Sequence, residues 1–158
     1  MKKVTIISLI VFLLDRIIKI IITNNFTLNV RNKIISGFFY ITNCHNEGAA
    51  FSLFSGNIMF LVFITLIILF LIYKAIKKDK GMNLITCLSY GILLGGILGN
   101  LYDRVFLGYV IDYLDFIIFD FDFAIFNVAD MCIVIGVIML MLFEGSDKSG
   151  GKNISKSE

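Results

Sequence analysis

Long apolar runs alternate with shorter polar connections along this chain. A helix that crosses about 30 Å of hydrocarbon needs roughly 20 apolar residues. Four runs approach that length, and the second is the cleanest of them: residues 4–22, 58–76, 84–101 and 123–143. The pattern therefore predicts a mainly α-helical integral membrane protein, built as a four-transmembrane-helix bundle.

The two longest connections have a different character. Residues 23–57 and 102–122 mix β-branched and aromatic side chains with turn residues such as Gly37, which is typical of short strands. We expect them to form a small β-rich cradle on the membrane surface. Residues 1–144 then make a single domain, and the polar tail at 145–158 is predicted to be disordered.

Basic residues indicate how the chain is oriented, because cytoplasmic loops carry an excess of lysine and arginine. They precede the first run, occupy the end of the second run and the short connection after it, and follow the last run: Lys2, Lys3, Lys74, Lys77, Lys78, Lys80, Lys148, Lys152 and Lys156. Both termini are thus predicted to be cytoplasmic. The first run starts like a signal peptide, but charges occupy the place of a cleavage site, so we interpret it as a retained span.

Composition excludes several classes of function. Hydrophobic residues make up 58% of the chain, and there is no long basic block, so a nucleic-acid partner has no support. The cysteines, Cys44, Cys87 and Cys132, are odd in number and irregularly spaced, and His45 is the only histidine. This argues against a disulfide framework and a metal site, and we expect no cofactor.

Charged residues inside the first run have a structural interpretation. Asp15 and Lys19 are four positions apart, so they share a helix face and can form an ion pair. Arg16 points elsewhere and is expected to reach the membrane interface.

Glycine recurs at every fourth position of the third run, at Gly91, Gly95 and Gly99. This small-xxx-small pattern lets helix backbones approach closely. Close packing would fix the direction in which Asn100 and Arg104 point at the end of that helix.

The acidic residues are concentrated near the predicted outer face. Five of the chain's twelve acidic residues lie between positions 103 and 122. Asp130 follows Asn127 by three positions in the fourth run, on one helix face. Ionisable groups in membrane segments favour a functional interpretation. The "NEGAAFS" segment at 46–52 is either a simple turn or a place where a substrate backbone passes.

Two aspartates could perform hydrolysis here. A Ser–His–Asp set is excluded by the lack of a suitable histidine, and spacing cannot show a serine near Lys19. Two close carboxyls share a proton, so one can activate water while the other polarises a carbonyl. Asp112 and Asp130 fit, since both lie where outer segments meet apolar runs. The same residues could instead form an ion path in a small transporter, or the chain could be a purely structural subunit.

The ordered motifs resemble those of the lipoprotein signal peptidase (signal peptidase II) family. The matching strings are "LLDRIIK", "NEGAAFS", "GGILGNLYDRVFLGYVIDY" and "FNVADMCIVIG", spread from Asp15 to Gly136. The resemblance implies an aspartic membrane peptidase that cleaves prolipoproteins just before a diacylglyceryl-modified cysteine, using activated water and no metal.

Carried onto this chain, the resemblance makes Asp112 and Asp130 the catalytic pair. Supporting and substrate-binding roles fall on Asp15, Lys19, Asn46, Gly48, Ala49, Asn100, Asp103, Arg104, Asn127 and Ala129. Asp103 and Arg104 would act as a scaffold, through an ion pair or by holding the outer loop and the substrate backbone. Tyr113 and Arg16 depart from the more frequent Phe and Gln, at positions with no implied role.

The expected setting is the bacterial cytoplasmic membrane, with the active site near its outer face. The partners are then a lipid-modified prolipoprotein and membrane lipids, and we expect a monomer.

Overall fold

A computed structural model describes residues 1–48, 54–79, 81–119 and 121–143. Within them it contains the helices α1 (Lys2–Asn25), α2 (Ile58–Lys78), α3 (Leu84–Phe106) and α4 (Val128–Phe143). The strands are β1 (Arg31–Ile35), β2 (Phe39–Asn46), β3 (Val110–Ile118) and β4 (Phe121–Asp122). Ala49 and the tail at 145–158, whose disorder was predicted, lie outside the described residues.

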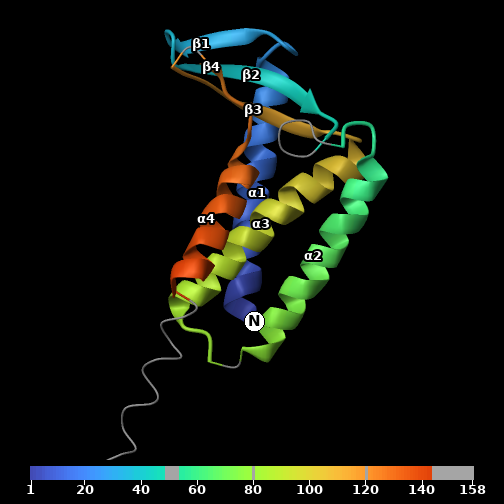
Figure 1. The fold of residues 1–158 in the computed structure, drawn as a ribbon, viewed down its shortest axis with the longest axis vertical. Coiled ribbons are helices and arrows are strands. Elements are labelled where there is room, and N and C mark those ends of the chain that lie inside the picture. The colour runs from blue at the N-terminus through green and yellow to red at the C-terminus, as the bar shows by residue number, and fades with distance from the viewer. Residues whose placement is uncertain (49–53, 80, 120, 144–158) are drawn as a thin grey trace, which may run out of the picture.

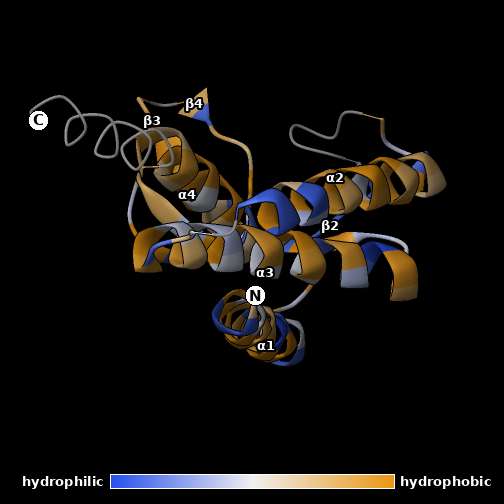
Figure 2. Ribbon diagram, turned by 90° about the horizontal axis from the view of Figure 1, so that it is seen from below, coloured by the Kyte–Doolittle hydropathy of each residue, from blue (hydrophilic) through white to orange (hydrophobic). Residues whose placement is uncertain are grey.

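The sheet covers one end of the helices, as Figure 1 shows. The prediction of a mainly helical chain with a small sheet is confirmed. Hydrophobic residues make up much of the helices, as the orange ribbon in Figure 2 shows, and many large apolar side chains are exposed; Phe63 and Phe70 of α2 are 60% and 59% exposed. Such surfaces are unfavourable in water and stable against lipid.

Two described helices, α2 and α3, are long and apolar enough to cross a membrane. The α4 helix is apolar but shorter. It begins at Val128, later than the start of the apolar run, because residues before it are extended: Phe126 bridges Leu114 of β3. The N–H groups of Tyr113 and Leu114 both donate to the Phe126 carbonyl. Four crossings remain a prediction.

Glycines bring α3 into close contact with its neighbours. A Cβ added at Gly95 would lie 2.5 Å from Val11 Cβ of α1, and one at Gly96 would lie 2.4 Å from the Ala129 carbonyl oxygen of α4. The close helix approach predicted from the glycine spacing is confirmed. Helix α3 is consequently held between α1 and α4, and its end is fixed in position.

The strands form one antiparallel sheet in the order β1-β2-β3-β4. In the β2–β3 register Cys44 faces Asp112, after a register shift that follows Ile41. Ile111 and Tyr113 of β3 pack with Ile22 at the end of α1. The third strand is thereby anchored on the bundle, and it carries Asp112 to the mouth of the helices.

Candidate active site

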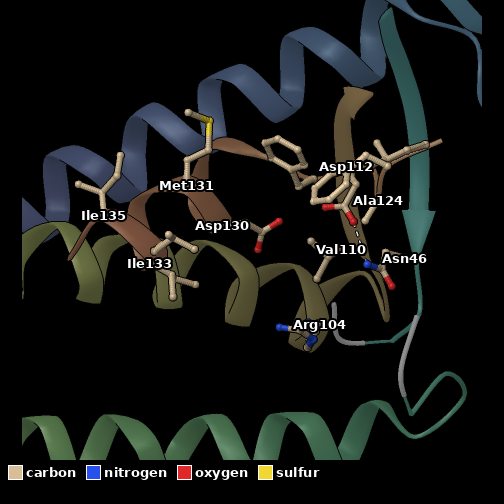
Figure 3. Close-up of a pocket in the computed structure, with 13 residues that line it drawn as sticks. Asn46, Arg104, Val110, Asp112, Ala124, Asp130, Met131, Ile133 and Ile135 are labelled. Carbon is tan, nitrogen blue, oxygen red and sulfur yellow. Dashed lines mark hydrogen bonds between the residues drawn. The ribbon is translucent and has the colours of Figure 1, made fainter. Parts of the chain in front are cut away.

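A pocket of about 620 Å³ lies where β3, the end of α3 and the start of α4 meet. Four polar residues line it, together with apolar residues of α4 and of the segment that precedes this helix: Asn46, Arg104, Asp112, Asp130, Val110, Phe123, Ala124, Ile125, Phe126, Met131, Ile133, Val134 and Ile135. In Figure 3 the Asp112 and Asp130 carboxyls point into the same space from β3 and α4. The two aspartates singled out in the sequence therefore share one pocket.

Asp112 is almost fully buried, at 3% exposure, and both of its oxygens accept hydrogen bonds. Asn127 Nδ2 donates to Oδ1 at 2.6 Å, and Asn46 Nδ2 donates to Oδ2 at 2.8 Å. Burial, followed by the nearby Asp130 charge, raises the pKa of Asp112 from 3.8 to about 7, although the two amides oppose the shift. This carboxyl is thus poised to hold or release a proton near neutrality.

Asp130 lies in the first turn of α4 and caps it. Its backbone N–H donates to Asn127 Oδ1 at 2.9 Å, while its Oδ2 accepts from the Asn127 N–H at 3.1 Å. This reciprocal pair is a capping box with aspartate in the usual place of glutamate. Its Oδ1 accepts from Asn100 Nδ2 at 2.7 Å. These contacts fix the Asp130 carboxyl at the N-terminus of α4, facing the pocket.

The amide of Asn100 is oriented by Lys19. Lys19 Nζ, which is fully buried, donates to Asn100 Oδ1 at 2.9 Å, and Asn127 Nδ2 approaches the same oxygen at 3.2 Å. With its oxygen held by donors, Asn100 must direct its N–H₂ group at Asp130. A continuous hydrogen-bonded chain therefore joins Lys19 to both aspartates.

Lys19 is itself held between two carboxylates. Its Nζ lies 2.7 Å from Asp103 Oδ2 and 2.9 Å from Asp15 Oδ2, and all three side chains are inaccessible to solvent. The Asp15 contact is an ion pair whose angles fall outside hydrogen-bond geometry. The predicted Asp15–Lys19 pair is confirmed, and Asp103 is the additional partner. Gly99 makes room for the Asp15 carboxylate, since a Cβ at this glycine would lie 2.5 Å from Asp15 Oδ2.

Arg16 is where the sequence interpretation was wrong. Its guanidinium forms an ion pair with buried Asp103 and lies over the Tyr102 ring, 4.5 Å from the centroid. It faces α3 because α1 and α3 are close enough for the side chain to reach across. Asp103 therefore acts through ion pairs, as one version of the scaffold prediction had it.

Arg104 follows the other version of that prediction. Its Nη2 donates to the Gly48 carbonyl at 3.1 Å, so it holds the chain just after β2. The Gly48 N–H donates to Asn46 Oδ1 at 2.9 Å, which turns the Asn46 amide nitrogen toward Asp112. Ala129 is fully buried against Gly96 and lies in the α3–α4 contact.

Two residues at the site had been given no role. The Tyr113 hydroxyl accepts from the Val128 N–H at 3.2 Å, so β3 also holds the first turn of α4. Buried Asp115 accepts from Arg31 Nε and Thr42 Oγ1, both at 2.7 Å, and so ties β1 and β2 to β3. A second acidic residue beside Asp112 in a strand that is apolar at most other positions was the available signal for Asp115. Among the described residues, no three His, Cys, Asp or Glu side chains group as metal ligands.

Comparison with known proteins agrees with this architecture. The family model for signal peptidase (SPase) II matches residues 7–144. The lipoprotein signal peptidase of Halothermothrix orenii is 38% identical over 140 residues, covering 89% of this chain and 93% of its own. That of Staphylococcus aureus is 36% identical over 147 residues, covering 93% and 90%.

Two solved structures, each of a bacterial membrane enzyme, share the fold. One superposes with a TM-score of 0.84 at 35% identity, covering 97% of this chain and 93% of that one. The other has a TM-score of 0.79 at 36% identity, covering 90% and 92%. The matched region includes the helices, the sheet and the pocket, and the chain belongs to the signal peptidase II family.

Proposed function

We propose that this protein is a membrane aspartic endopeptidase that removes signal peptides from prolipoproteins, cleaving just before the diacylglyceryl-modified cysteine. The observation that carries the proposal is the pair of carboxyls, Asp112 and Asp130, which face one pocket and are bridged by Asn127. Family membership supports the substrate class, and the exposed apolar surface of the helices supports a membrane setting.

The environments of the two carboxyls suggest separate roles. Asp130, at a helix N-terminus with two donors on its oxygens, would be the base that takes a proton from water. Asp112, whose pKa is raised to about 7, would keep its proton and donate a hydrogen bond to the scissile carbonyl.

The water oxygen would bond to the carbonyl carbon while its proton passes to Asp130. When the C–N bond breaks, Asp130 would return that proton to the leaving amine, and Asp112 would end the cycle protonated. Both carboxyls are thereby restored, and the step needs no other reactant.

The remaining residues would position the substrate. Asn46 and Arg104 line the polar edge of the pocket, while Met131, Val134 and Ile135 form an apolar wall along α4. Such a wall suits acyl chains and the apolar core of a signal peptide. The chain of contacts from Asp15 and Lys19 through Asn100 and Asn127 would keep the pair in register.

In the proposed setting the protein is a monomer that crosses the bacterial cytoplasmic membrane four times, with both termini inside and the sheet on the outer surface. Lysines at the helix ends opposite the sheet support this orientation, since Lys2, Lys3, Lys77 and Lys78 all lie there.

The test is cleavage of a purified precursor with and without its diacylglyceryl group. Asp112→Asn and Asp130→Asn should each lower the rate at least about 10²-fold, the scale of lost acid–base catalysis, while the protein still accumulates in the membrane. Asp122→Asn is the matched control, because that carboxylate is 69% exposed and outside the pocket.

Near wild-type cleavage by either pocket variant would contradict the assignment of the pair. Equal cleavage of the unmodified precursor would contradict the substrate class. Ion flux into vesicles that depends on the same aspartates would favour a transporter instead.

A further inference from the structure

A second cavity, of about 640 Å³, lies at the end of the helices opposite the sheet. It is formed by the start of α1, the end of α2 and the beginning of α3, and its lining comprises Met1, Lys2, Lys3, Ile76, Lys77, Asp79, Met82 and Cys87. None of these residues belongs to the first pocket. Its chemistry is therefore independent of the aspartate pair.

The floor of this cavity is apolar and well packed. Ile76 and Cys87 are 5% and 6% exposed, and they form a cluster with Val4 and Tyr90 that joins α1, α2 and α3. A polar solute would gain nothing from contact with this floor, whereas a hydrocarbon segment would bury apolar surface there.

The rim is cationic, and one of its lysines, Lys77, also lies over the Tyr73 ring, with its Nζ 5.0 Å from the ring centroid. Lys2, Lys3 and Lys77 are exposed, and within the described part of the chain no carboxylate forms an ion pair with any of them. The one acidic residue of the lining, Asp79, accepts from the Gly81 N–H at 3.1 Å. In addition, α1 begins here with no acidic residue in its first turn, so its helix dipole adds positive potential.

We propose that this cavity binds the headgroup phosphate of an anionic phospholipid, with the glycerol and upper acyl segment over the Ile76–Cys87 floor and the acyl chain along α2. Three exposed lysines that form no ion pair within the described residues complement a net negative headgroup. Basic pockets between membrane helices are known binding places for such lipids. A free phosphate would leave the apolar floor empty, and a zwitterionic lipid would bring its own cation to the rim.

A lipid bound in this cavity would also stabilise the position of α2. The helix packs mainly on α3, and within the described residues only Leu61 and Ile76 of α2 are buried. A lipid held between Lys3 of α1 and Lys77 of α2 would join the lower end of this weakly packed helix to the bundle.

Native mass spectrometry of the full-length protein in detergent tests the proposal, by titration with phosphatidylglycerol, phosphatidylcholine or inorganic phosphate. Wild type should bind phosphatidylglycerol most tightly. The Lys3→Gln/Lys77→Gln variant should lose roughly tenfold or more in affinity, since each lysine near an anionic lipid contributes about a factor of five. The control is Lys33→Gln/Lys74→Gln, which removes the same charge outside the cavity and should bind like wild type.

Equal affinity for phosphatidylcholine, an equal loss in the control, or phosphate binding that displaces the lipid would each overturn the proposal. If the double variant does not fold, Lys3→Gln and Lys77→Gln are measured singly, and each should lose about fivefold. Precursor cleavage is measured in parallel and should stay at the wild-type rate in both variants, so failure of this site is distinguishable from failure of the proposed peptidase.

Discussion

Asn127 shows how much of the pocket depends on a single amide. Its Nδ2 donates to Asp112 at 2.6 Å, and its Oδ1 accepts from the Asp130 backbone N–H at 2.9 Å. Since oxygen and nitrogen are fixed by different partners, the side chain cannot flip without losing both contacts. Asn127 thus helps to set the orientation of β3 relative to the start of α4, together with the Tyr113–Val128 and Leu114–Phe126 contacts.

The pH dependence of cleavage should report on Asp112. Asn46 stabilises the ionised form of this carboxyl and so lowers its pKa. Asn46→Ala removes that donor, and the pKa should rise further. If protonated Asp112 is required, activity falls as the pH rises through the pKa of Asp112. In Asn46→Ala the alkaline limb of kcat/KM should therefore move to higher pH. The expected shift is roughly one pH unit, which corresponds to the energy of one hydrogen bond to a charged group.

Asn32→Ala is the matched control, because among the described residues the Asn32 amide donates only to the Val30 and Ile41 carbonyls. Its alkaline limb should coincide with that of wild type. A limb that moves to lower pH in Asn46→Ala would rule out the assigned role of Asp112.

Lys19 offers a second test at this scale. Lys19→Met leaves buried Asp15 unpaired, and the loss of one partner of a buried pair costs about 3–5 kcal/mol. The thermal midpoint in detergent should therefore drop sharply, and precursor cleavage should drop with it because Asn100 loses its orienting donor. Adding Asp15→Leu should recover part of the midpoint without recovering cleavage.

Additive losses of stability in the double variant would contradict the ion-pair account. Full recovery of cleavage would show that Lys19 does not orient Asn100.

At the scale of elements, α3 holds the molecule together through its glycines. Gly96 faces the Ala129 carbonyl of α4, and Gly136 of α4 faces Leu93 of α3, where an added Cβ would lie 2.7 Å from the leucine Cβ. The α3–α4 contact is therefore close along its length. Because Ala129 and Asp130 are adjacent, the spacing of these helices also sets the position of the carboxylate.

Gly96→Ala should separate α3 from α4, since the new Cβ would lie 2.4 Å from a backbone oxygen that has no flexible end to move. We expect a loss of about 1–3 kcal/mol from overpacking, seen as a lower thermal midpoint, together with slower cleavage. Gly81→Ala has no atom within 4 Å of the new Cβ and should match wild type. An unchanged midpoint in Gly96→Ala would show that the helices adjust freely.

Helix identity was predictable at this scale, and helix boundaries were less so. The runs at 58–76 and 84–101 became helices at Ile58–Lys78 and Leu84–Phe106, because hydropathy and length suffice to identify such segments. The start of α4 was not predictable from hydropathy, since residues before Val128 are equally apolar and pair with β3 through Phe126.

Ion pairs between residues far apart in the sequence could not be predicted from it either. Spacing within one helix revealed the Asp15–Lys19 pair, but the contact of Arg16 with Asp103 depends on how closely α1 approaches α3. The Arg31–Asp115 pair likewise depends on a sheet register that contains a shift. The motif positions of Asp112 and Asp130 placed the candidate pair, and the tertiary fold supplied the amides that connect it.

At the scale of the whole molecule, the sheet lies at one end of the helices and a group of lysines at the other, and this difference predicts the orientation in the membrane. In a cysteine-free background, Lys33→Cys on β1 should react with a membrane-impermeant maleimide added to intact cells. Lys78→Cys, at the far end of α2, should react only after the membrane is permeabilised. Both side chains are exposed, so access to reagent is the only difference, and the reverse pattern would invert the proposed orientation.

The capping box at the start of α4 fixes the position of the Asp130 carboxylate relative to the apolar wall of the pocket. Asp130 both closes the helix and faces the pocket, and Ile135, five residues on, still lines the same wall. At 1.5 Å per residue the wall extends about 7.5 Å along the helix axis from the carboxylate. In the proposed reaction, a substrate whose scissile bond reaches Asp130 would therefore lay its apolar part along about 7.5 Å of this wall.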